Sequence, residues 1–83
     1  MPAKRFTDEK TNEKRRFSLR AIHARRCANL TQDQAATKTL IHVQRIRDFE
    51  GMQAWPESAE LDALAAVYAA EAAWLLGIPP YDL

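Results

Sequence analysis

The amino-acid sequence predicts an all-α fold, a compact bundle of about five helices. Between Ala3 and Trp55 it contains no proline, and Gly51 is the only glycine there. Good helix formers dominate, and Val, Ile and Thr do not alternate with polar residues as they do in strands. Of the 83 residues, 47% are hydrophobic. Because 15 of the residues are alanine, the larger apolar side chains suffice for only one small domain.

The first helix is expected to begin between residues 8 and 17 and to end near Ala28. Its apolar residues recur every three or four positions, as on one face of a helix. They are Phe17, Ala21, Ala24 and Ala28. Residues 1–16 are interpreted as a basic N-terminal arm or helix extension, with the first six residues as a loose chain.

A second, short helix is predicted to open at Thr31. Gln34 follows Thr31 at the spacing of a capping box, in which each side chain accepts a hydrogen bond from the other residue's backbone N–H. This helix is expected to end near Thr37, and a turn over residues 38–41 follows.

A third helix is predicted from His42 to Glu50, with Val43 or Ile46 and Phe49 on its apolar side. Gly51 is expected to end it. Ala36, in the second helix, is expected to be small because two helices meet there.

A fourth helix is predicted from Ser58 to Tyr68, because Leu61 and Leu64 share its buried face with Tyr68. Residues 69–76 form a fifth helix or continue the fourth. Gly77 and the Pro79-Pro80 pair end it.

Two short helices joined by a tight turn form a helix-turn-helix. Residues within this motif and after it follow one characteristic spacing. Within the motif they are Leu30, Thr31, Gln32, Ala36, Ile41, Ile46, Phe49 and Glu50, and after it they are Pro56, Leu61, Leu64, Ala65, Tyr68, Leu75 and Leu76. In this spacing the chain resembles the Cro and phage-repressor family of helix-turn-helix domains, also called the xenobiotic-response-element type. Residues 17–77 are therefore interpreted as the helix-turn-helix domain, and residues 78–83 as a C-terminal tail.

The chain departs from the family pattern in the turn. The family usually has glycine there, where φ is positive, and this chain has Leu40. Either the turn has another shape or Leu40 is strained. The glycine that follows the glutamate also comes one residue early, at Gly51.

Charge is segregated along the chain. Residues 1–30 carry nine basic and three acidic side chains, residues 31–53 carry three of each, and residues 54–83 carry five acids and no base. A polyanion such as DNA is attracted by the first part and repelled by the last. The alternative is that the basic residues form a solvated helix face.

The resemblance implies that the third helix enters the major groove of double-stranded DNA. Base contacts are then expected from His42, Val43, Gln44, Arg45 and Arg47. Gln can pair with adenine, Arg with guanine, and Val can touch a thymine methyl group. Phosphate contacts are expected from Thr31, Gln32, Lys38, Arg15, Arg16 and Gln53. The alternative is that the same residues form an ordinary exposed polar helix face that does not contact DNA.

The resemblance also implies a homodimer, paired through the region around the last helix. The expected interface residues are Tyr68, Trp74, Leu75, Ile78, Tyr81 and Leu83. An exposed apolar patch of this kind usually marks an interface. The alternative is that Trp74 closes the core of the monomer and the tail frays.

No catalytic or metal-binding pattern is present in the sequence. His23 and Cys27 are four residues apart, which supplies at most half of a metal site, and no triad or glycine-rich phosphate loop is found. We therefore expect no enzymatic activity, metal, cofactor or small-molecule ligand. The lack of a secretory signal or long apolar run, with a single cysteine, predicts a cytoplasmic protein without a membrane span.

These observations predict a sequence-specific DNA-binding transcriptional regulator. It would be a phage- or mobile-element-type repressor that acts as a homodimer on an inverted-repeat operator. The alternative is a helical protein–protein interaction adaptor or an antitoxin-like module that binds a protein partner. The basic first helix and the side chains of Gln44, Arg45 and Arg47 favour the first function, whereas Leu40 in the turn and the net charge of +1 favour the second.

Overall fold

The computed structural model describes residues 2–76, with side chains from residue 13 onward. Its helices are α1 (Pro2–Cys27), α2 (Gln32–Thr39), α3 (Val43–Glu50), α4 (Ser58–Tyr68) and α5 (Ala72–Leu76). Between residues 2 and 76 no strand is present. The predicted all-α bundle of five helices is therefore confirmed.

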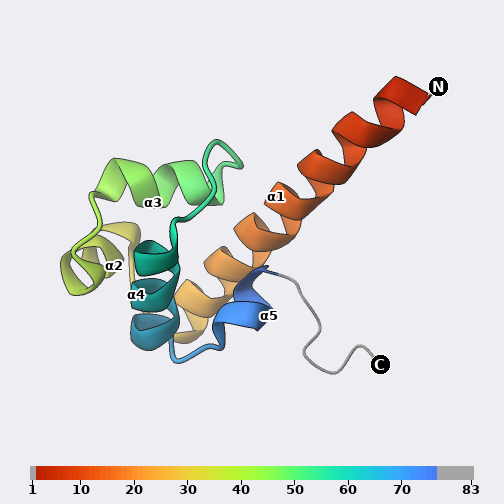
Figure 1. Cartoon of the computed structure of the whole chain (residues 1–83). Helices are drawn as coiled ribbons and strands as arrows, with labels where there is room; N and C mark the ends of the chain where they lie inside the picture. The colour runs from red at the N-terminus through yellow and green to blue at the C-terminus, as the bar shows by residue number, and fades with distance from the viewer. Residues whose placement is uncertain (1, 77–83) are drawn as a thin grey trace.

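The first helix is longer than the sequence predicted. It begins at Pro2, so the first residues are helical rather than a loose chain. Proline fits the first turn of a helix, where its missing N–H would have no partner. The N-terminal half of α1 projects away from the other helices, which gather around its C-terminal half (Figure 1). Residues 2–16 thus form a helix extension.

The later boundaries differ from the prediction by only a few residues. α2 continues to Thr39 rather than Thr37, and α4 has the predicted bounds. The fifth helix is separate from α4, because Ala69 has a left-handed backbone with φ of 54° and interrupts the chain between them.

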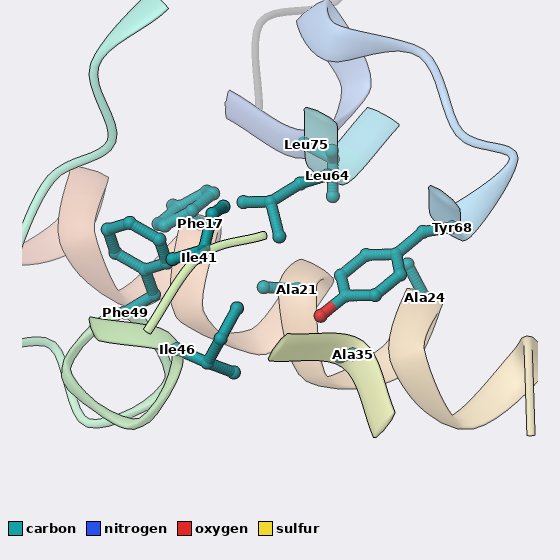
Figure 2. Packing of buried hydrophobic residues seen from close by; sticks show 10 residues of the cluster. All are labelled: Phe17, Ala21, Ala24, Ala35, Ile41, Ile46, Phe49, Leu64, Tyr68 and Leu75. Carbon is teal, nitrogen blue, oxygen red and sulfur yellow. The ribbon is translucent and has the colours of Figure 1, made fainter. Parts of the chain in front are cut away.

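One face of α1 forms the centre of the core. Phe17, Ala21 and Ala24 are buried there, as their spacing predicted, whereas Leu19 is 60% exposed. α3, α4 and α5 pack against α1, and α2 packs against α3 and α4, so that apolar side chains of all five helices and of the α2–α3 turn join one core (Figure 2). Outside α1 these side chains are Ala35, Ile41, Ile46, Phe49, Leu64, Tyr68 and Leu75.

Ile46 and Phe49 anchor α3 in this core, and their predicted burial is confirmed. The ring of Phe49 meets the ring of Phe17 edge to face, with 5.6 Å between the ring centroids. In α2 the fully buried small residue is Ala35, whereas Ala36 is half-buried and packs against the core. Ala35 shares its face with the buried Thr39 one turn later, whereas Ala36 points about 100° away around the axis.

Left-handed residues end each of the first four helices, and none of them is glycine. They are Asn29, Leu40, Met52 and Ala69. Gly51 follows α3, as expected. Its φ is −97°, so it does not have the left-handed backbone that a glycine at a helix end usually adopts. A β-carbon on Gly51 would lie 3.2 Å from the Arg47 carbonyl oxygen, which favours glycine on steric grounds.

Leu40 has the left-handed conformation that the family reserves for glycine, with φ of 61°. The turn is held from inside by Thr39, whose hydroxyl donates to the Ala35 carbonyl and accepts the N–H of Ile41. Leu40 itself is 91% exposed. It therefore carries backbone strain without compensation from packing.

Phe49→Ala is expected to lower the free energy of unfolding by roughly 3–5 kcal/mol, because it empties the contact between α1 and α3. Urea denaturation followed by circular dichroism measures this loss. Leu19→Ala is the control, and it should change stability by no more than about 0.5 kcal/mol. Equal effects of the two substitutions would contradict the described core.

Leu40→Gly is expected to stabilise the protein by about 0.5–1 kcal/mol, the relief of left-handed strain minus the entropy that glycine loses on folding. Thermal and urea unfolding test this. Leu40→Ala keeps the β-carbon and should bring no such gain. A destabilised Leu40→Gly variant would show that the leucine side chain makes a stabilising contact.

Candidate nucleic-acid interface

The segment from Thr31 to α3 is built on local hydrogen bonds. The predicted capping box is confirmed: Thr31 Oγ1 accepts the Gln34 N–H at 3.1 Å, and Gln34 Oε1 accepts the Thr31 N–H at 2.9 Å. His42 was expected inside the third helix, but it is the N-cap residue of α3. Its Nδ1 accepts the N–H of Gln44 at 3.0 Å. Both short helices thus begin with a side-chain cap.

α3 exposes a polar face on the side opposite to Ile46 and Phe49. We call His42, Val43, Gln44, Arg47 and Asp48 the outer face of α3. His42, Gln44 and Arg47 are exposed, and the other two are half-buried. Three of the five expected base-contact residues, Val43, Gln44 and Arg47, thus lie along this side of α3, and His42 lies at its N-terminal end.

Asp48 on this face was missed by the sequence analysis. Its Oδ1 accepts a hydrogen bond from Gln44 Nε2 at 3.0 Å. The spacing of four residues between the two side chains was the signal that could have found it. A carboxylate here can accept a hydrogen bond from cytosine N4, which arginine and lysine cannot do.

Arg45, the fifth expected base-contact residue, is turned toward α4. Its Nε and one terminal nitrogen donate to the two carboxylate oxygens of Glu60, at 2.7 and 3.0 Å. The guanidinium also lies over the Phe49 ring, 5.0 Å from its centroid. The hydrogen bonds to Arg45 hold the pKa of Glu60 below its ordinary value, so the pair is charged at neutral pH.

The expected phosphate-contact residues are distributed over three segments. Thr31, Lys38 and Gln53 are exposed, as are Arg15 and Arg16 on α1. Gln32 is different, because it is half-buried and its Nε2 donates to Glu50 Oε1 at 2.9 Å. Its side-chain amide is therefore engaged within the protein.

Arg25 and Glu50 form a bidentate ion pair between α1 and the end of α3. The two hydrogen bonds are 2.7 and 3.0 Å long, and the side chains are only 13% and 6% exposed. Arg25 also donates to the Leu30 carbonyl, and Gln32 brings α2 into the same network. The bonds to Glu50 raise the pKa of Arg25 further. This network fixes α3 relative to α1 and α2.

The structure describes three of the residues expected at a dimer interface, which are Tyr68, Trp74 and Leu75. Tyr68 and Leu75 are buried inside the monomer, at 5% and 0% exposure, so they are removed from that expectation. Burial raises the pKa of Tyr68 to about 12, so its hydroxyl stays neutral. Both side chains lie on the face of their helix that packs on α1, which periodicity alone did not distinguish from an outer face. Ile78, Tyr81 and Leu83 lie outside the described residues.

Trp74 is half-buried and packs along α1. The Arg20 guanidinium lies 5.0 Å from the centroid of its ring and donates to the Trp74 carbonyl at 2.8 Å. His23 lies on the same side, 6.2 Å between ring centroids. Trp74 therefore covers the C-terminal half of α1 and keeps part of its surface accessible.

His23 and Cys27 approach each other at 3.5 Å on the exposed side of α1. They line a hollow of about 370 Å³ between α1 and the segment that joins α4 to α5. Among residues with described side chains, no three His, Cys, Asp or Glu side chains are grouped for a metal ion.

None of the helices in the described part of the chain combines the length and the apolar character needed to cross a bilayer. Comparisons with family models, with curated proteins and with solved structures found no match to this chain.

Arg25→Met and Glu50→Leu are each expected to cost roughly 3–5 kcal/mol of unfolding free energy, because each leaves one buried charge without its partner. The double variant should cost much less than the sum, since no unpaired charge remains. Urea denaturation of the four proteins gives the coupling energy. Arg26→Met, at an exposed neighbouring position, is the control. Additive single costs would mean that the pair does not stabilise the packing of α3.

Proposed function

We propose that the protein is a sequence-specific DNA-binding regulator that inserts α3 into the major groove. The observation that carries this proposal is the outer face of α3. It presents amide, imidazole and guanidinium groups to solvent, while Ile46 and Phe49 on the opposite side hold the helix rigidly on the core. A rigid helix with exposed hydrogen-bonding groups is what direct readout of base edges requires.

The arrangement around this face supports the same proposal. α2 precedes α3 after a short turn, and its capped N-terminus offers backbone N–H groups to a phosphate. Arg15 and Arg16 precede Phe17, whose ring touches Phe49 at the other end of α3. Exposed cations near this end can contact phosphates and fix the register of α3 on the duplex.

The proposed regulator acts as a homodimer, because one α3 alone covers only a few base pairs. Two copies on a two-fold axis place their recognition helices about 34 Å apart, in successive major grooves. Among the described residues expected at the interface, Trp74 is the best placed for pairing, because part of its side chain is accessible. An inverted repeat among sequences selected from a random DNA pool would support this arrangement.

A protein–protein adaptor is the second candidate, and the exposed side chain of Leu40 favours it. A leucine that is 91% exposed on a turn, at the cost of backbone strain, suits contact with an apolar partner surface. In that case Leu40→Ala weakens binding to the partner protein, and DNA binding is absent at any salt concentration.

Gln44→Ala is expected to weaken binding to the selected DNA site by roughly 1–3 kcal/mol and to affect random DNA less, because the base contact is lost only at the selected site, whereas the hydrogen bond to Asp48 is lost in both cases. Arg15→Ala and Arg16→Ala should weaken both DNAs alike and reduce the dependence on salt. Gel shift at about 50 and 200 mM salt measures both effects. No binding at the lower salt concentration would exclude the DNA-binding function.

A further inference from the structure

Glu60 in the first turn of α4 is the acceptor at the centre of a small network. Its carboxylate accepts two hydrogen bonds from Arg45 and a third, at 2.9 Å, from the Glu57 N–H. Arg45 is held by a further contact of 3.3 Å to the Trp55 carbonyl. Two of the three guanidinium nitrogens thus donate to protein acceptors on α4 and the preceding loop.

This ion pair differs from that of Arg25 and Glu50 in its access to solvent. The side chains of Arg45 and Glu60 are 35% and 20% exposed, against 13% and 6% in the buried pair. Ion pairs open to water have little net stability, because water and salt compete with both partners. Arg45 is therefore accessible to a phosphate unless the two hydrogen bonds to Glu60 keep it on α4.

We propose that Glu60 is a specificity-determining residue for DNA binding, because it restrains a cation that would otherwise bind phosphate. This inference rests on the proposed function. Arg45 lies on the same short helix as Gln44 and Arg47, within reach of a backbone that flanks their bases. A phosphate contact adds affinity for every DNA sequence equally. Because Glu60 holds Arg45, discrimination between DNA sequences depends on the outer face of α3.

Glu60→Gln tests the restraint without removing the cap of α4. Glutamine also serves at the third position of a capping box, so it can still accept the Glu57 N–H. Asp62→Asn is the matched control, because Asp62 is an exposed acid on the same helix and is not bonded to Arg45. Both substitutions change the net charge equally, so a general gain in attraction for DNA appears in both.

Relative to Asp62→Asn, Glu60→Gln is expected to bind random DNA about tenfold more tightly near 50 mM salt and about threefold near 200 mM, as one added phosphate contact predicts. The slope of log affinity against log salt should steepen by about 0.9. The ratio of selected-site to random-DNA affinity should fall.

Arg45→Ala provides the second measurement. In the parent protein it should change DNA affinity by no more than about twofold, whereas in the Glu60→Gln background it should remove the whole gain. Fluorescence anisotropy with labelled duplexes and urea denaturation of each variant separate binding from folding.

The possible outcomes distinguish this inference from the proposed function. If the parent binds DNA and Glu60→Gln matches Asp62→Asn in affinity and salt slope, the role of Glu60 is wrong and DNA binding stands. Weaker binding by a folded Glu60→Gln also overturns it, since the pair then positions α3. If neither parent nor variants bind DNA near 50 mM salt, the proposed function itself fails.

Discussion

The buried ion pair between Arg25 and Glu50 is the contact on which the placement of α2 and α3 depends. Glu50 lies at the C-terminal end of α3, where the helix dipole disfavours a negative charge. Arg25 offsets that charge from α1, and Gln32 adds a donor from α2. Three helices therefore meet on one carboxylate. Removing any partner leaves a buried group unsatisfied, which costs more than the pair contributes in net stability.

The Arg45–Glu60 pair uses the same bidentate chemistry at the surface, with different consequences. The buried pair has little competition from water, because its side chains are only 13% and 6% exposed. The surface pair is partly open to solvent, so only the bonds to Glu60 keep the Arg45 guanidinium on α4. Two arginine–glutamate pairs in one small domain thus divide into a structural contact and a contact that restrains an accessible cation.

The helix ends place residues other than glycine at left-handed backbone positions. Leu, Met and Ala each have a left-handed backbone where glycine would have less strain. Around Leu40 the buried Thr39 supplies the hydrogen bonds that keep the turn in shape. The strain is local and sits beside the polar face of α3. Leu40 projects into solvent next to the candidate interface.

Local signals in the sequence determined the helices, the capping box at Thr31 and the burial of Ile46 and Phe49. These features depend on residues within about four positions of one another, which a linear pattern displays. The same patterns could not separate Ala35 from Ala36 as the buried small residue, nor assign Tyr68 and Leu75 to the core instead of a dimer surface. That choice depends on which helix covers each face.

Only the tertiary structure decided which polar side chains are free to bind a partner. In sequence, Arg45 and Arg47 look equally suited to base contacts, yet Arg45 is paired with Glu60, 15 positions away. Glu50 is likewise joined to Arg25 across 25 positions. No spacing rule relates residues so far apart, because their distance is set by the packing of whole helices and not by the period of any one of them.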